Sequence, residues 1–288
     1  MDSSTSHHTL TSNAHNHDSA NMRKTGIITT QHNIKCYYEQ EGSGPHIVLI
    51  PDGFGDCHEF DKAVSLIADK GFTVTTFDMP GMSRSRDAPP ETYQDVTSAR
   101  LAEYVIGITD ALGIKEAAFW GCSSGGGIVL NILKAFPDRV RNAMPHEVPF
   151  YEAKSLSEFR AMSDEEIVEK ISHLTFVFLG ADPKAWEALG KDCHERLKRN
   201  YVTWARGYTG TLTHTIPTTA EDILKKPIDW SVGKATPTIG TLVSENVEMG
   251  KSMGIEVKYI SGSHFPSVDC PEEFAQYVVD TCRKYTTV

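Results

Sequence analysis

The sequence predicts an α/β fold with a mostly parallel central sheet flanked by helices and interrupted by a helical cap insertion. Short apolar runs typical of buried strands alternate with amphipathic, helix-like segments over the first 150 residues. This rhythm stops between about residues 151 and 215 and then returns. Strands that alternate with helices imply right-handed crossovers, and therefore parallel neighbouring strands.

The elements follow in order along the chain. Alternation at 27–29 and 34–38 predicts an antiparallel pair of strands joined near residues 32–33. Helical periodicity is present at 60–68, 96–112 and 128–133. Buried or half-buried strands are predicted at 47–50, 72–77, 117–120, 142–144, 236–242 and 257–260.

The predicted organisation has three parts. Residues 1–22 are rich in Ser, Thr, Asn and His and have almost nothing to bury, so they are predicted to be a disordered tail. Residues 23–150 and 216–288 form the predicted core. Residues 151–215 form the predicted cap, in which a capping box at 163–166, Asp182-Pro183 and the segment 194–201 indicate helices. The cap follows a strand whose carboxyl end faces the predicted site, so it would roof that site.

Composition excludes several classes of function. Acidic residues outnumber basic ones by 38 to 28, a net charge of −10, which disfavours nucleic-acid binding and gives no basic patch for a membrane surface. The six cysteines form no C-x-x-C pair and no metal-ligand spacing. Without a signal-like or long apolar segment, the sequence predicts a cytoplasmic protein that uses no metal and no organic cofactor.

Residues 121–125 form a G-x-S-x-G motif where a strand-like run gives way to a helix-like one. The motif by itself is common, but this setting is what a nucleophile elbow requires. Ser123 would then stand exposed above the sheet as the nucleophile. The amide of Ser124, at the helix N-terminus, would point toward an oxyanion. The second amide is predicted at Gly53, in the loop after the strand 47–50, unless this glycine only serves a turn.

A serine nucleophile needs a general base and an acid that orients the base. His264 follows the last predicted strand and is the expected base; His146 is interpreted as a structural or pocket-edge residue. The acid is either Glu245, just past the strand before His264, or Glu147, one strand earlier. Adjacent strands are only about 5 Å apart, so both can reach the imidazole. Spacing alone favours Glu245.

Several stretches together resemble the fungal zearalenone hydrolases, which are lactonases with the α/β-hydrolase fold. The resemblance runs from about residue 25 to the C-terminus and rests on residues 51–53, 75–85, 121–125, 141–144, 204–208 and 264–266. It implies that Glu147, rather than Glu245, is the acid, and that Gly53 and Ser124 supply the oxyanion amides. It also implies a homodimer and a substrate-binding set made of Trp204, Asp52, Leu174 and Tyr208.

The resemblance therefore implies a serine hydrolase that opens the ester of zearalenone-like resorcylic macrolactones through an acyl-enzyme. The segment 171–179 is expected to line the pocket, and it is bulkier and more aromatic than the resemblance leads us to expect, which leaves the preferred lactone open. The alternatives are a carboxylesterase or carbon–carbon bond hydrolase acting on another hydrophobic compound, and a slow-turnover ligand receptor. Dehalogenases and epoxide hydrolases need an aspartate where Ser123 stands.

Overall fold

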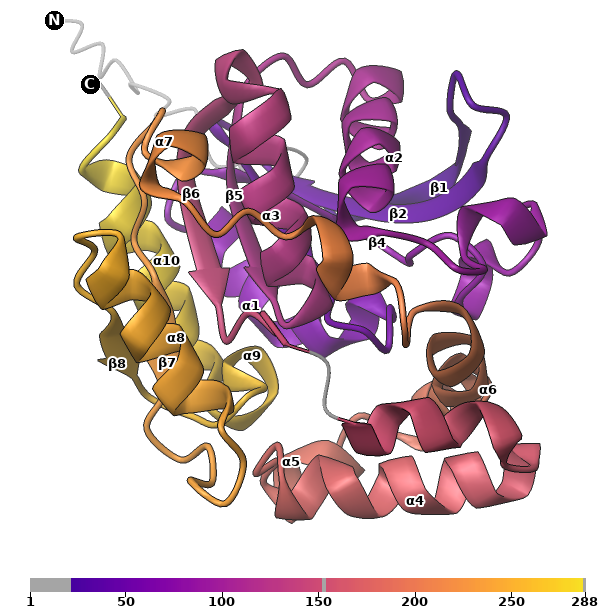
Figure 1. Cartoon of the computed structure of the whole chain (residues 1–288). Coiled ribbons are helices and arrows are strands. Elements are labelled where there is room, and N and C mark those ends of the chain that lie inside the picture. Colours follow the sequence, from indigo (N-terminus) through magenta and orange to yellow (C-terminus); the bar gives the residue numbers. More distant parts are fainter. Residues whose placement is uncertain (1–21, 152–153, 287–288) are drawn as a thin grey trace, which may run out of the picture.

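The computed structural model describes residues 22–151 and 154–286 (Figure 1). Apart from Met22, the tail predicted at residues 1–22 lies outside the described residues. One eight-stranded sheet forms the centre, in the order β1-β2-β4-β3-β5-β6-β7-β8. Its strands are β1 (Lys24–Thr29), β2 (Lys35–Gly42), β3 (His46–Ile50), β4 (Thr73–Phe77), β5 (Ala117–Cys122), β6 (Val140–His146), β7 (Ser231–Gly233) and β8 (Lys258–Ile260).

The sheet is mixed but mostly parallel, as predicted. β2 pairs antiparallel with β1 and with β4, whereas all pairs from β4 through β3, β5, β6 and β7 to β8 are parallel. Every predicted strand before residue 147 is present. Because the carboxyl ends of parallel strands share one edge, the loops that follow β3, β5, β6, β7 and β8 meet at that edge.

Helices cover both faces of the sheet. α2 (Ser98–Ala111) and α3 (Ser124–Ala135) pack on one face, and α1 (Asp61–Ala68) and α10 (Pro271–Arg283) on the other (Figure 1). Successive residues of β3 point to opposite faces of the sheet: Val48 belongs to one apolar cluster and Leu49 to the other. Both faces are buried, which explains why the central strands read as continuous apolar runs.

The core holds three further α-helices, and short 3₁₀ helices lie along the whole described part of the chain. The remaining α-helices there are α7 (Ala220–Ile223), α8 (Leu242–Ser252) and α9 (Pro266–Asp269). Short 3₁₀ helices lie at Cys57–Phe60, Ser83–Ser85, Pro90–Thr92, Pro137–Arg139, Lys154–Ala161 and Leu212–Thr215. No helix in the described part of the chain has both the length and the apolar composition that crossing a membrane requires.

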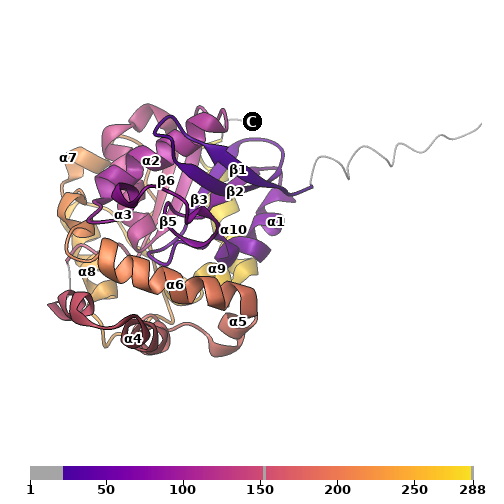
Figure 2. The ribbon, with the colours of Figure 1, turned by 90° about the vertical axis from the view of Figure 1, so that its right-hand side faces the viewer.

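Three helices stand apart from the two layers that cover the sheet, and we call them the cap helices. They are α4 (Asp164–Val177), α5 (Pro183–Glu187) and α6 (Lys191–Gly207). The predicted capping box of Ser163 and Glu166 opens α4, and Asp182 caps α5. In both views α6 lies between α4 and the body of the sheet (Figures 1 and 2). The cap helices share an apolar cluster with Phe54 and Phe265, which come from loops of the core.

The strand predicted at 236–242 is wrong. Residues 236–241 form a loop and α8 begins at Leu242, while the strand that precedes β8 is β7, at Ser231–Gly233. Pro237 lacks the N–H that a central strand donates to its neighbour, so this β-branched stretch cannot join the ladder. β7 itself has only three residues, too few to show an alternating pattern.

Candidate active site

Ser123 occupies the sharp turn that was predicted between β5 and α3. Its backbone has φ 52° and ψ −119°, a strained conformation for a residue with a side chain, and the residue is partly exposed. The turn depends on its glycines. A Cβ at Gly121 would lie 2.3 Å from the carbonyl oxygen of Gly125, and one at Gly125 would lie 2.4 Å from that of Pro51. The Ser123 amide donates to the His146 carbonyl at 2.9 Å, which fixes the turn to β6.

Glu147 and His264 form a buried pair at the same edge. Glu147 directly follows β6, and His264 lies in the loop after β8. His264 Nδ1 lies 2.7 Å from Glu147 Oε2, and the two residues are 1% and 0% exposed. The other carboxylate oxygen, Oε1, accepts hydrogen bonds from the Gly233 amide at 2.7 Å and from Thr236 Oγ1 at 2.6 Å. One oxygen of the Glu147 carboxylate thus faces the histidine, and the other accepts two hydrogen bonds that fix its orientation.

The surroundings of Glu147 favour its charged form. Burial alone raises the pKa of this carboxyl, but the hydrogen bond from His264, the electrostatic influence of the His264 ring and the hydrogen bond from Thr236 outweigh it. Together they lower the pKa of Glu147 to about 2. At neutral pH the group is therefore an anion, which can only accept a hydrogen bond from His264 Nδ1.

His146 lies behind this pair rather than in it. Its Nε2 donates to the Ser263 carbonyl at 3.4 Å, its Nδ1 lies 2.9 Å from Ser231 Oγ, and its ring stacks on Trp120. Burial lowers the pKa of His146 to about 4, only partly opposed by the charge of Glu147, so the ring is neutral. These contacts join β6, the start of β7 and the residue before His264.

Glu245, the acid that spacing favoured, lies elsewhere. It belongs to α8, where its carboxylate accepts from the Thr241 hydroxyl one turn earlier. The preference for Glu245 depended on a strand at 236–242. Because the structure has no strand there, that preference has no basis. The carboxylate that the structure sets against His264 is that of Glu147.

Gly53, Ser124 and Trp204 meet above the Ser123 turn. A Cβ at Gly53 would lie 2.4 Å from Trp204 Nε1, 2.6 Å from Trp204 Cδ1 and 3.0 Å from Ser124 Oγ. The close approach of the indole therefore requires glycine here, and Gly53 does not have the positive φ that would by itself call for one. Ser124 is the first residue of α3, so its amide has no acceptor within the helix and lies at the positive end of the helix dipole.

Of the other predicted substrate contacts, Asp52 and Tyr208 are buried and Leu174 is partly buried. Asp52 is 4% exposed, and its Oδ1 accepts from the Phe54 amide at 2.8 Å. Burial raises its pKa to about 6 against the opposing effects of His264 and of backbone hydrogen bonds. Tyr208 is buried in the apolar cluster on the α2–α3 face, and its hydroxyl has no hydrogen-bond partner among the described residues. Leu174 is partly buried and packs against the apolar cluster of the cap helices.

The segment 171–179, predicted to line the pocket, is divided. Ile171 and Thr175 are buried within the cap helices, whereas Phe176 and Phe178 are 39% and 40% exposed. Leu179 reaches the site through its backbone, because its carbonyl accepts from the His264 amide at 3.2 Å. Sequence reasoning missed this contact and the part played by Thr236, which lay in the misassigned strand. Within residues 22–151 and 154–286, no three His, Cys, Asp or Glu side chains gather so as to hold a metal ion.

The fold and this arrangement define an α/β hydrolase: the model of the alpha/beta hydrolase fold matches residues 45–226. An esterase of known structure from Thermogutta terrifontis superposes with a TM-score of 0.72 at 18% identity, over 92% of this chain and 100% of its own. Two relatives are much more similar in sequence. The chain is 51% identical to a zearalenone hydrolase of Cladophialophora bantiana, over 91% of this chain and 98% of the relative, and 47% identical to one of Bionectria ochroleuca, over 92% and 100%. The chain belongs to the zearalenone hydrolase family.

Proposed function

We propose that this protein is a lactonase that opens the ester ring of zearalenone and related resorcylic macrolactones. The observation that carries the proposal is the near full-length similarity, at 51% and 47% identity, to two zearalenone hydrolases. The geometry supports the same chemistry, since a serine on a strained strand-to-helix turn and a buried histidine–carboxylate pair share one edge of the sheet. These are the parts that acyl transfer by a serine hydrolase requires.

In the first step, Ser123 Oγ attacks the lactone carbonyl carbon while His264 Nε2 takes its proton. The carbonyl oxygen becomes an anion, which we assign to the amides of Gly53 and Ser124. The proximity of Gly53 to the Ser124 side chain and the position of Ser124 at the start of α3 support this assignment. Collapse of the tetrahedral intermediate breaks the ester C–O bond. His264 protonates the departing alkoxide, and the opened ring stays attached to Ser123 as an acyl ester.

In the second step, water attacks the acyl carbon and gives its proton to His264, which returns it to Ser123 Oγ. The product leaves as a hydroxy acid. Glu147 keeps the proton of neutral His264 on Nδ1 and stabilises the imidazolium that forms in each step. The 2.7 Å contact and the lowered pKa of Glu147 support this role, because an ionised carboxylate can only accept from the ring.

We assign residues 151–215 to a cap that roofs the site, with Trp204, Asp52, Leu174 and Tyr208 shaping the pocket. Trp204 has the most direct support, because its indole packs on Gly53. An indole at that position can contact both the loop and an aromatic lactone. We further propose that the protein acts as a homodimer and that its small-molecule partner is the macrolactone substrate.

Incubation with zearalenone, followed by chromatography of the ring-opened product, tests the function. We expect repeated turnovers from the wild type and only residual turnover from Ser123→Ala. A panel that adds simple carboxylic esters and carbon–carbon bond substrates separates a lactonase from an esterase or a carbon–carbon hydrolase. Ser123→Ala with near wild-type activity would contradict the mechanism, and tight binding without turnover would indicate a receptor.

A further inference from the structure

We propose that Asn200 is a positioning residue that, together with Arg196, clamps the loop carrying Gly53 from the cap side. We call residues 51–56 the oxyanion loop. The inference rests on the proposed function, since it assigns a purpose to the rigidity of that loop. Asn200 lies in the middle of α6, and nothing in its sequence surroundings marks it as functional.

One face of α6 contacts the oxyanion loop at three successive points. Arg196, Asn200 and Trp204 are spaced four residues apart, so their side chains lie in a row along the helix. Arg196 Nε lies 2.7 Å from Asp56 Oδ2, Asn200 Nδ2 donates to the Phe54 carbonyl at 2.6 Å, and the Trp204 indole packs on Gly53. The row therefore follows the loop from its end back to the predicted oxyanion amide.

The Phe54 side chain strengthens the same contact. Its ring packs edge-on against Tyr201 of α6, with the centroids 4.7 Å apart, and edge-on against Trp204 at 6.1 Å. The backbone and the side chain of the residue next to Gly53 are thus both held by α6.

Asn200 uses its whole side-chain amide in this clamp. The residue is 1% exposed, and Oδ1 accepts from the Ser83 amide at 2.9 Å. Nδ2 donates to Ser83 Oγ at 2.7 Å as well as to the Phe54 carbonyl. Ser83 has a positive φ of 45°, which is costly for a residue with a side chain, so several contacts must hold it there. A buried amide with this set of partners admits few alternative positions for the segments that it joins.

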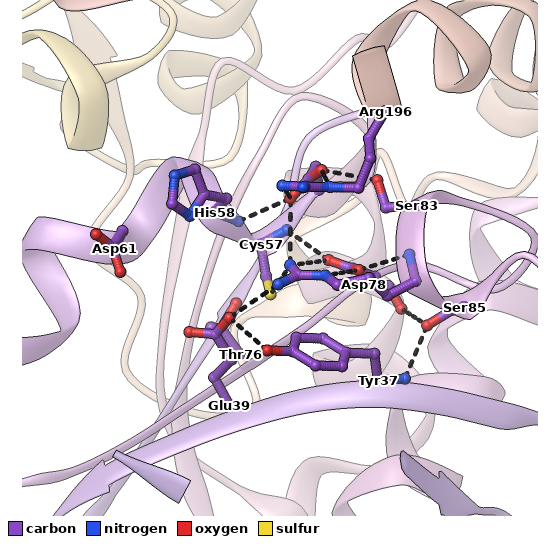
Figure 3. A network of polar contacts seen from close by, with 12 residues as sticks. Tyr37, Glu39, Cys57, His58, Asp61, Thr76, Asp78, Ser83, Ser85 and Arg196 are labelled. Carbon is purple, nitrogen blue, oxygen red and sulfur yellow. Dashed lines mark hydrogen bonds and ion pairs between the residues drawn. The ribbon is translucent and has the colours of Figure 1, made fainter. Parts of the chain in front are cut away.

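The loop is held from the sheet side as well, through Asp56, whose partners include Ser83, His58 and Arg196. These three residues belong to the network in Figure 3. Asp56 accepts from Ser83 Oγ at 2.8 Å, from the His58 amide at 3.0 Å and from Arg84 at 3.3 Å, in addition to Arg196. Arg84 in turn pairs with Asp78 at 2.7 Å and with Glu39 at 3.2 Å. Asp78 follows β4, and Glu39 lies in β2. The oxyanion loop is therefore fixed between the edge of the sheet and α6.

Such rigidity matters because an oxyanion donor acts only when it is in place. Loss of one donor lowers kcat by about 100- to 1000-fold, and a displacement of 1 Å can cost about 100-fold. Asn200 holds the carbonyl of the residue after Gly53, so loosening it would move the Gly53 amide without removing it. The effect should fall on the transition state rather than on binding of the substrate.

Asn200→Asp tests the proposal, because it keeps the acceptor for the Ser83 amide and removes the Nδ2 donor, which serves both the Phe54 carbonyl and Ser83 Oγ. The readouts are kcat and KM for zearalenone and for the small ester p-nitrophenyl acetate, and the affinity for phenylboronic acid, whose tetrahedral serine adduct mimics the intermediate. We expect kcat to fall by about 10- to 100-fold on both esters, boronate affinity to fall in parallel, and KM to change by less than about twofold. Arg199→Gln, on an exposed position of α6, should behave as the wild type.

Wild-type kcat in folded Asn200→Asp would overturn the proposal, as would a rise in KM for zearalenone with unchanged kcat on the small ester. If thermal unfolding shows that Asn200→Asp does not fold, Arg196→Gln decides the question, since that side chain is partly exposed and should lose about 3- to 10-fold in kcat with the same pattern. The small ester allows the proposed role of Asn200 to be tested separately from the proposed zearalenone substrate. A wild type that hydrolyses it but leaves zearalenone intact refutes the proposed substrate and still allows the clamp to be measured.

Discussion

His264 and Glu147 are 117 residues apart in the sequence, and their side chains meet at 2.7 Å between Nδ1 and Oε2. The contact arises because β6 and the loop after β8 deliver both residues to the carboxyl edge of the sheet. The two remaining hydrogen bonds to the carboxylate come from the end of β7 and the loop after it. Gly233 and Thr236, which lie between β6 and β8 in the sequence, thus hold the Glu147 carboxylate in place against His264.

Replacement of Glu147 by glutamine should lower kcat by about 10³- to 10⁴-fold. The amide keeps the size of the carboxylate but can donate to the ring, which favours the wrong tautomer of His264 and removes the negative charge that stabilises the imidazolium. The matched control is Glu245→Gln. It changes a carboxylate on α8 that accepts a hydrogen bond from Thr241, the residue just before that helix. Steady-state kinetics with zearalenone on both variants gives the comparison. A large loss in Glu245→Gln with little change in Glu147→Gln would contradict the assignment.

His146 should make the free energy of unfolding depend on pH. Its pKa is about 4 in the folded protein against an ordinary value of 6.5, so the unfolded chain binds the proton more readily. Stability from this group is complete above pH 6.5 and is lost as the pH falls toward 4. Between pH 7 and pH 5 the loss is about 2 kcal/mol. The same linkage for Glu147 acts lower, between its ordinary 4.5 and about 2.

The His146→Gln variant isolates this effect, because glutamine can still donate to Ser263 and accept from Ser231 but does not titrate near neutral pH. Asp52, whose pKa is raised to about 6, titrates in the same range with the opposite sign, so wild-type data alone are insufficient. Urea unfolding at pH 7 and pH 5 should show a stability loss about 2 kcal/mol larger in the wild type than in His146→Gln. Equal losses in the two proteins would mean that His146 is not held neutral by the fold.

Local patterns were sufficient to predict the part of the site that depends on local structure. The turn at Ser123 could be predicted because its glycines, the apolar strand before it and the helix after it are contiguous in the sequence. The partner of His264 could not be identified by spacing, because β7 has three residues and Pro237 lies in a stretch that otherwise resembles a strand. The resemblance to a known family, rather than periodicity, pointed to Glu147.

Contacts that depend on tertiary structure left no signal in the sequence. Asn200 and Phe54 are 146 residues apart, and an asparagine in the middle of an amphipathic helix is indistinguishable from a surface residue until the helix is docked. A loop glycine such as Gly53 is usually explained by the freedom of its backbone, yet here the structure shows a different reason, which is the close approach of the Trp204 indole. A close approach between two distant segments cannot be read from either segment alone.

Gly53→Ala tests that reason through its coupling to Trp204. The added methyl group would overlap the indole at 2.4 Å, so the loop or the indole must move, and kcat/KM should fall by about 100-fold. In a Trp204→Ala background the indole is gone and the nearest remaining atom is Ser124 Oγ at 3.0 Å, so the same change at Gly53 should cost less than about tenfold, a non-additivity expected of residues in direct contact. Gly240→Ala is the control, because the nearest atom to its Cβ would be 3.8 Å away. Kinetics on the four proteins of the cycle measure the coupling. Strictly additive losses would show that the contact with Trp204 is not what requires glycine at position 53. The backbone conformation of the loop would then be the reason for the glycine.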